Sequence, residues 1–328
     1  RAAQGLSAAG KGKVGFLPGG RLTFEDAYAW SKFARVVCGT NDIDQRTRTA
    51  GREEESFLGA YFAGAGMPVT YDDLEKAGQV LLVGFEPEDE CGAVFLRLRK
   101  GVRNGSVKVA TVAPFASPSS VKTAATVLFA APGTEPEVVA NVKADAEGDF
   151  GAVFAGLKDE GAVIVVGERA GIVPGLLSAV NHLAARSGAR LAWIPRRSGE
   201  RGGVEAGLLP GLLPFGRDGH DSSARNDLAT VWGGQLPAEP GRDTQQILRA
   251  AASGELSALV LGGLDLRDLP DQDLVGKALK KCPFVVSLEI NFTPAAEAAD
   301  VVFPVAPVSE KPGTFINWEG RLRPFGQA

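Results

Sequence analysis

The sequence predicts an α/β fold in which parallel strands alternate with helices. Three nearly continuous apolar runs, at 79–84, 162–167 and 256–262, are typical of strands that are covered on both faces of a sheet. Helical patterns separate these runs, and such β–α–β spacing indicates parallel, right-handed, doubly wound sheets of the Rossmann-like kind. The chain has 328 residues, more than one hydrophobic core usually serves, so we expect two such domains.

The first elements can be read in order from the amino terminus. A short strand at 13–17 ends at the turn Pro18-Gly19-Gly20. A helix should follow Thr23, a good N-cap, because two acids stand in its first turn, where the helix dipole favours negative charge. An extended segment at 35–37 then leads to a turn at 39–42.

The middle of the chain repeats the same alternation up to residue 194. Besides the runs above, we expect strands at 107–113, 125–129 and 190–194 and helices at 94–100, 136–146 and 174–187. An acidic loop is expected at 86–90. Residues 195–242 are rich in glycine, proline and charge, which indicates loops. Their apolar stretch at 207–216 fits a packed internal loop and a partner contact equally well.

The last third returns to regular elements. Helices are expected at 245–252 and 272–281, a short helix after Thr293, and strands at 283–290 and 300–305. The stretch Ser309–Arg321 follows, with a Pro-Gly turn signal, two aromatic residues and Gly320, which can adopt a positive φ. Composition alone describes this stretch as a strand that leaves the core with a Trp pinned on it.

Charge and cysteine usage argue against several functional classes. The net charge of −4 gives no electrostatic footprint for nucleic acid. No apolar run approaches the roughly 20 residues of a membrane span, so we expect a soluble segment. There is no C-x-x-C pattern, so neither a disulfide framework nor an iron–sulfur cluster is expected. The widely spaced thiols and imidazoles, which lack ligand-like neighbours, are Cys38, Cys91, Cys282, His182 and His220.

Three motifs carry a resemblance to a known family. The stretch EKPGTFINWEGR at 310–321 resembles the E-K-x-G-T-F-x-N-x-E-G-R signature of the molybdopterin oxidoreductase superfamily. Residues 21–48 and 284–305 resemble two further family segments, L-x-x-E-D-A-Y-x-x-x-K-F-A-R-x-x-x-G-T-N-N-x-D and V-V-x-x-D/E-x-F-x-T-E-T-A-x-x-A-D-V-V-L-P. Within the superfamily the chain most resembles the large iron–sulfur subunits (the G subunits) of NADH:quinone oxidoreductase, respiratory complex I, of the actinobacterial type.

The resemblance covers nearly the whole chain and implies a domain plan. It implies two domains of the formate dehydrogenase/DMSO reductase type, one formed by 1–45 plus 243–308 and an inserted one at 46–242. Residues 309–328 would begin the return to a missing domain. Because the chain starts with Arg1 and ends just after the signature, we expect a fragment of a longer subunit. The 2Fe–2S and 4Fe–4S clusters of the family would bind in the missing amino-terminal part.

The chain departs from the family where catalytic members bind a metal. They place a cysteine or selenocysteine ligand a few residues beyond the G-T-N segment, whereas residues 45–55 here contain no thiolate. Molybdenum and tungsten favour soft ligands, so we expect no metal centre, although Asp44 and Ser56 are not excluded by residue type.

The nucleotide-binding loops of the family are also altered. Ala113 stands in place of an aspartate and no arginine follows Pro114, whereas phosphates favour Arg or Lys and free backbone N–H groups. The turn at 167–171 lacks a G-x-G-x-x-G pattern, which favours an ordinary strand–helix turn. Pro294 or Ala295 replaces a threonine. We therefore expect no catalytic, cofactor-binding or metal residue, only a vestigial pterin region near Gly39, Thr40, Asn41, Asp42, Gly84, Ala113, Gly313 and Asn317.

The resemblance implies a redox-silent structural part of the complex I large subunit. This part would support electron transfer from NADH to quinone by a proton-translocating assembly. Its implied partners are other peripheral-arm subunits, at the cytoplasmic face of the cell membrane and with no direct membrane insertion. Two alternatives stay open: a molybdopterin-dependent oxidoreductase such as a formate dehydrogenase, and a stand-alone nucleotide-binding module.

Overall fold

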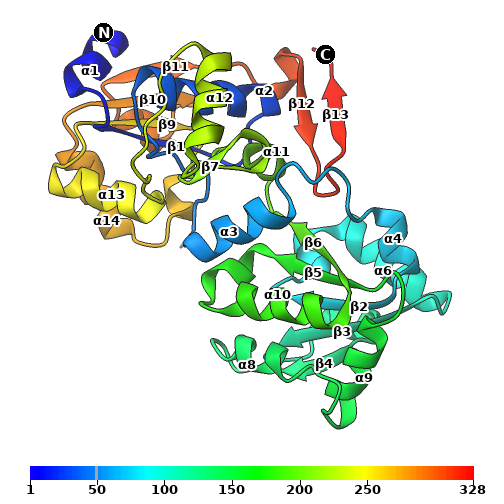
Figure 1. The fold of residues 1–328 in the computed structure, drawn as a ribbon. Coiled ribbons are helices and arrows are strands. Elements are labelled where there is room, and N and C mark those ends of the chain that lie inside the picture. Colours follow the sequence, from blue (N-terminus) through cyan, green and yellow to red (C-terminus); the bar gives the residue numbers. More distant parts are fainter. Residues whose placement is uncertain (49–50) are drawn as a thin grey trace. The chain divides into compact units, whose positions relative to one another are not determined.

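The chain forms two compact units, each built on its own parallel sheet (Figure 1). The computed structural model describes residues 1–48 and 51–328. Unit 1 contains residues 1–64, 197–317 and 322–328, and unit 2 contains residues 65–196 and 318–321. In each unit helices cover the sheet, so the predicted α/β fold with parallel strands is confirmed.

The sheet of unit 1 has four strands in the order β1-β9-β10-β11, all parallel. They are β1 (Val14–Pro18), β9 (Ala258–Gly262), β10 (Val285–Glu289) and β11 (Val301–Pro304). On the free side of β1, Phe16 makes an isolated parallel bridge with Ile43. The bridge at Ile43 therefore lies beside one edge of β1, and the strands from the last third of the chain, β9 to β11, lie on its other side.

Helices bury both faces of this sheet, because alternate strand residues point to opposite faces. Phe16, Ala258 and Val260 belong to a core with α2 (Phe24–Lys32), and Leu259 and Leu261 belong to a second core. The helices that cover the sheet are α1 (Ala2–Ala9) and α2 on the first core, and α13 (Thr244–Ser253) and α14 (Gln272–Lys281) on the second.

Most sequence expectations for this unit hold, with one correction. Thr23 caps α2 by accepting a hydrogen bond from the Asp26 N–H, as expected. The prediction of an extended segment at 35–37 was wrong, because Phe33–Val37 continues α2 as a π-helical turn. Arg35 explains the difference. It is fully buried and its guanidinium donates to the carbonyl oxygens of Gly207, Leu209 and Leu212, which holds the backbone helical.

The region expected to be loop-rich contains two helices of unit 1. They are α11 (Glu200–Glu205), whose two glycines hide its periodicity, and α12 (Ser222–Trp232). The apolar stretch at 207–216 packs inside the unit, since its four leucines are each at most 4% exposed. The remaining elements of the unit are α3 (Arg52–Tyr61), β7 (Leu212–Leu213), β8 (Arg217–Asp218), α15 (Pro294–Glu297) and short 3-10 turns at Pro214–Gly216, Leu266–Asp268 and Val308–Glu310.

The sheet of unit 2 has five parallel strands in the order β4-β3-β2-β5-β6. They are β2 (Gly78–Val83), β3 (Val107–Ala113), β4 (Thr126–Phe129), β5 (Val163–Gly167) and β6 (Arg190–Ile194), close to the predicted ranges. Val80 and Leu82 pack with α4 (Tyr71–Lys76) and α6 (Gly92–Arg103) on one face. Gly156 of α9 (Gly148–Leu157) lies against Gln79, which points to the other face.

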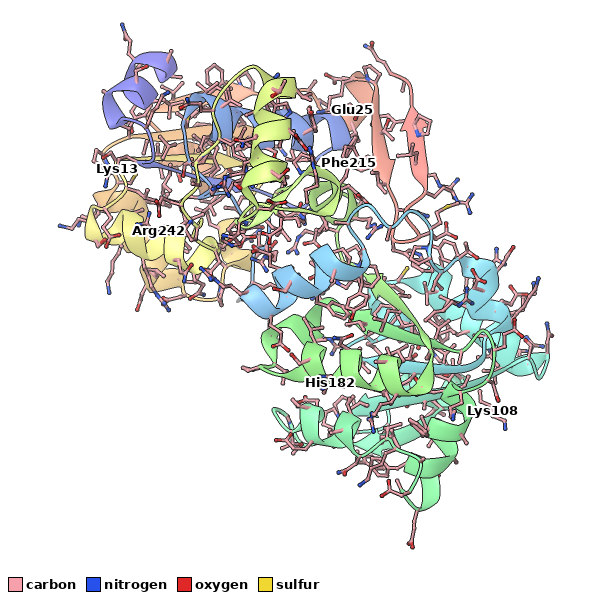
Figure 2. All side chains as sticks on the ribbon, in the orientation of Figure 1. Lys13, Glu25, Lys108, His182, Phe215 and Arg242 are labelled. Atoms are coloured by element: carbon pink, nitrogen blue, oxygen red, sulfur yellow. The ribbon has the colours of Figure 1, made fainter. Side chains whose placement is uncertain are left out.

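The helices of unit 2 differ from the predictions in several places, since α4 was not predicted and α6 and α10 (Leu176–Ser187) have other bounds than expected. The acidic loop expected at 86–90 contains a helical turn, α5 (Pro87–Glu90). The helix expected at 136–146 ends early, as α8 (Glu135–Ala140), and α9 was not predicted because glycines interrupt its pattern. The unit also contains α7 (Pro118–Lys122) and a 3-10 turn at Glu168–Ile172, and His182 is exposed on α10 (Figure 2).

The signature stretch forms an antiparallel hairpin of β12 (Gly313–Ile316) and β13 (Leu322–Phe325). Phe315 and Phe325 stack across it with ring centroids 5.5 Å apart. The hairpin packs on α2 of unit 1, where the Thr314 N–H donates to Glu25 at 2.9 Å. Figure 2 labels Glu25. Gly320 in the connection has φ +90°, a conformation that favours glycine.

The observed units divide the chain at other points than the expected domains. Residues 46–64 and 197–242, expected in the inserted domain, lie in unit 1. The physical reason is packing, since Trp232 donates a 2.6 Å hydrogen bond to Tyr28 and Arg35 binds the 207–212 backbone. Within the described residues, no helix combines the length and hydrophobicity that crossing a bilayer requires.

Candidate functional site

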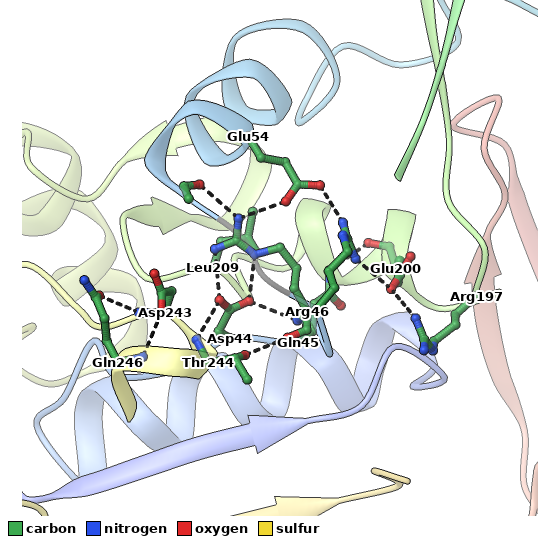
Figure 3. A network of polar contacts seen from close by, with 12 residues as sticks. Asp44, Gln45, Arg46, Glu54, Arg197, Glu200, Leu209, Asp243, Thr244 and Gln246 are labelled. Atoms are coloured by element: carbon green, nitrogen blue, oxygen red, sulfur yellow. Dashed lines mark hydrogen bonds and ion pairs between the residues drawn. The ribbon is translucent and has the colours of Figure 1, made fainter. Parts of the chain in front are cut away.

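The stretch after the turn at 39–42 forms a buried ion-pair network in unit 1 (Figure 3). Arg46 donates to both carboxylate oxygens of Asp44 at 2.9 Å and to Glu54 at 3.2 Å. Their side chains are at most 3% exposed. Burial lowers the pKa of Arg46, but the two carboxylates outweigh burial and raise this pKa above its ordinary value. Arg46 is therefore a fixed positive charge that neutralises this part of the core.

The network continues toward the end of β9. Arg48 pairs with Glu54 and with Glu200 of α11. Arg197 pairs with Glu200 at 3.4 Å (Figure 3) and with Asp268 at 3.0 Å. On its other side the network reaches α13. The Thr244 N–H donates to Asp44 at 3.1 Å and the Thr244 hydroxyl donates to the Arg46 carbonyl oxygen at 2.6 Å.

This network lies in the stretch in which, by the family resemblance, catalytic members place a metal ligand, and the residues of that stretch that the structure describes do not suit a molybdenum or tungsten centre. Asp44 accepts four hydrogen bonds, three from Arg46 and one from Thr244, which use both carboxylate oxygens. Ser56 is exposed on α3. Burial raises the pKa of Cys38 to about 11, so this thiol stays protonated at neutral pH. Thr49 and Ala50 of the stretch lie outside the described residues.

The turn at 39–42 uses its polar side chains inside unit 1. Thr40 accepts from the Asp42 N–H at 3.0 Å. Asn41 accepts from Arg35 at 3.0 Å and donates to two carbonyl oxygens of the 237–239 loop. Asp42 accepts from the backbone and side chain of Arg242 at 2.8 and 2.9 Å. These hydrogen bonds join the polar side chains of the turn to other segments of unit 1 and stabilise its fold.

The predicted residues of unit 2 lie together at the carboxyl ends of neighbouring strands. Gly84 follows β2 with φ +60°, and the Cβ of any other residue would clash with Ala170. Ala113 ends β3, and the loop after it exposes 64% of Phe115. The nearby Glu90 pairs with Arg169 at 2.7 Å. A carboxylate and an exposed aromatic ring are poor partners for a phosphate.

The two predicted residues of the signature stretch have different surroundings. Gly313 packs closely on Thr23 and on the ring of Phe325 in unit 1. Asn317 precedes Trp318, whose ring is 8% exposed and belongs to the core of unit 2. Trp318 meets Tyr71 edge to face at 5.0 Å, and the Tyr71 N–H donates to Glu319 at 3.0 Å. The stretch is thus a packing element of both units.

A cavity that the sequence analysis did not predict lies at the carboxyl ends of β1, β9 and β10 in unit 1. Its volume is about 470 Å³. Gly19 and Gly263 approach closely at its base, where a Cβ on Gly19 would clash with the Gly263 carbonyl oxygen. Glu289, the last residue of β10, lines the cavity and is 7% exposed. The sequence signal that could have indicated this cavity is an acidic residue, Glu289, at the end of a buried strand.

Replacing Glu289 with glutamine should stabilise the purified chain at alkaline pH. Burial raises the pKa of Glu289 above the ordinary 4.5, so the folded state binds this proton more tightly than the unfolded state does. The stability contributed by Glu289 is then complete below about pH 4.5 and is lost as pH rises through the folded pKa. We expect Glu289→Gln to gain about 1 kcal/mol at pH 8 and less at pH 5, measured by urea unfolding. An equal effect at both pH values would contradict this.

Comparison with known proteins identifies the family. A family model described as molybdopterin oxidoreductase matches residues 2–328. The chain belongs to the molybdopterin oxidoreductase family. Its resemblance to this family, predicted from the three motifs, is confirmed.

Within the molybdopterin oxidoreductase family, the chain is similar to named subunits and to a solved structure of low identity. It is 52% identical over 328 residues to the G subunit of NADH-quinone oxidoreductase from Mycobacterium tuberculosis and 52% identical over 345 residues to that from Streptomyces coelicolor. The whole chain is matched, and it spans 40% and 41% of those relatives. A chain of the formyltransferase/hydrolase complex (FhcABCD) from Methylorubrum extorquens aligns with all of this chain and with 88% of its own length, with a TM-score of 0.60 at 18% identity. This similarity supports the fold alone.

Proposed function

We propose that this chain is a redox-silent structural part of the large iron–sulfur subunit of NADH:quinone oxidoreductase. In this proposal the two units are doubly wound Rossmann-like domains that have kept the family fold without its cofactor. Electrons would pass from NADH to quinone through 2Fe–2S and 4Fe–4S clusters held elsewhere in the full subunit and its neighbours. The partners would be other peripheral-arm subunits at the cytoplasmic face of the cell membrane, and this segment would not enter the membrane.

One observation carries the proposal. Where catalytic family members need a soft metal ligand, this chain has the ion-paired network of Asp44, Arg46 and Glu54. A buried arginine that is already paired with two carboxylates leaves no anionic oxygen of Asp44 free to bind a metal cation. The 52% identity over the whole chain to the G subunits of NADH-quinone oxidoreductase supports the choice of assembly.

The proposal is tested by metal and pterin analysis of the full-length subunit, purified from a host that makes the molybdenum cofactor. We expect molybdenum, tungsten and pterin to be far below one equivalent, with pterin measured by fluorescence after oxidative denaturation. A catalytic family member purified in parallel from the same host serves as the positive control. Stoichiometric pterin and metal would instead make the chain a molybdopterin-dependent oxidoreductase such as a formate dehydrogenase.

A further inference from the structure

The cavity of unit 1 contains a buried carboxylate, Glu289, that no cationic side chain of the described residues pairs with. Glu289 is 7% exposed, and its Oε1 has no hydrogen-bond partner among the described residues. Two other acids that line the cavity are paired, Asp26 with Lys311 and Asp265 with Arg267. Among the described residues Glu289 makes no ion pair, and Arg21, the one lining cation that pairs with no acid there, is exposed to solvent, so the buried carboxylate itself is unmatched.

An unmatched buried carboxylate is costly, and proteins keep such groups paired or bound to a ligand. Burial raises the pKa of Glu289, the backbone N–H groups of Leu264 and Gly263 lower it, and repulsion from Asp265 raises it further. The charged group that acts on Glu289 is thus another acid. A cation that entered the cavity would relieve both the burial penalty and this repulsion.

Large apolar side chains surround the exit of β10 and β11, next to this carboxylate. Ile290 is 58% exposed, Phe292 78%, Phe303 46% and Val308 45%. Ile290 and Val308 also line the cavity, and Phe303 lies beside Leu288 in the strand register. A pocket that holds a buried carboxylate and is surrounded by exposed aromatic and aliphatic groups has the features of an interface that receives an anchoring side chain.

We propose that this cavity is a docking site for a basic side chain, arginine or lysine, that a neighbouring protein subunit inserts toward Glu289. Charge complementarity favours a basic side chain, because its cationic group would form the ion pair that Glu289 lacks. The apolar rim of Ile290, Phe292, Phe303 and Val308 would pack on the partner and exclude water from the pair. A phosphate-bearing ligand is disfavoured, because Arg267 and Lys311 of the cavity already pair with acids and Arg21, the third cation of its lining, is exposed to solvent. The inference rests on the proposed function in taking a subunit as the occupant.

The test is site-specific photo-crosslinking in the full-length subunit within its purified complex. Phe292 is replaced by p-benzoylphenylalanine, the complex is irradiated, and cross-linked peptides are identified by mass spectrometry. We expect a cross-link to a second polypeptide, within a few residues of an Arg or Lys. Glu289→Gln, which keeps size and removes charge, should reduce its yield at least about tenfold. Glu160→Gln, at an exposed acid of unit 2, should leave the yield unchanged.

Several results would overturn the proposal. A cross-link that is equally strong in Glu289→Gln, one with no basic residue nearby, or a yield no higher than that of the probe at the exposed Leu96 would each do so. So would a nucleotide that is released on denaturation and lost in Glu289→Gln. The proposed function is tested separately. Metal and pterin at one equivalent would contradict it even if the cross-link were found, and a missing cross-link would not change the result of the metal analysis.

Discussion

Replacing Arg46 with alanine should lower the free energy of unfolding by about 3–5 kcal/mol, the effect expected when one partner of a buried ion pair is removed. The substitution leaves Asp44 and Glu54 buried without their shared cation. It also removes the guanidinium from the protein interior, which leaves a void beside α3 and α13. Urea unfolding of the purified chain at neutral pH measures the effect.

The matched control is Arg267→Ala, which removes an arginine from an exposed ion pair with Asp265. Water screens that pair, so we expect no measurable change in the unfolding midpoint. Arg46→Met tests the charge separately from the volume, because it fills much of the space without a cation. If Arg46→Ala were as stable as the control, the network would have no structural role and the main support for a redox-silent segment would be lost.

Replacing Trp318 with alanine should cost about 3–5 kcal/mol, because it empties part of the core of unit 2. The ring is 8% exposed and packs edge to face on Tyr71 and in the cluster that contains Val80 and Leu98. The loss should be local, with faster amide hydrogen exchange in β2, β3 and α6 and little change in the strands of unit 1.

Leu322→Ala is the control for this prediction, since Leu322 lies in the same hairpin and is 61% exposed. We expect its exchange pattern to match that of the unchanged chain. Hydrogen exchange followed by mass spectrometry distinguishes the two units directly. Equal acceleration in both units, or none in unit 2, would contradict the assignment of Trp318 to the unit 2 core.

The cavity of unit 1 connects these stability arguments to function. The network at Asp44 satisfies its charges internally, whereas Glu289 keeps a carboxylate oxygen without a partner. When it is ionised, such a group lowers the stability of the fold, which is why we expect glutamine to be the more stable residue there above neutral pH. Residues retained against stability are commonly functional, and the apolar rim beside Glu289 is consistent with a contact surface.

The strands and the family could be predicted from local sequence features. Runs such as 79–84 and 162–167 are apolar throughout, and a strand buried on both faces requires only that local property. The cap at Thr23 and the turn at Gly320 were likewise predictable, because each depends on a residue's own backbone preference or on neighbours a few positions away. The three motifs identified the molybdopterin oxidoreductase family, since they are long and nearly gap-free.

The pairing of distant charges and the division of the chain into units depend on contacts that only the folded chain makes. Asp44 meets Thr244, and Trp318 enters the core that holds Tyr71, across separations of 200 and 247 positions that no local pattern encodes. For the same reason most of the stretch 195–242, predicted to form loops, lies in unit 1 from residue 197 onward, where Arg35 and Trp232 hold it. Whether a charged residue is a ligand, a structural pair or an unmatched group depends on which side chains the fold brings within reach.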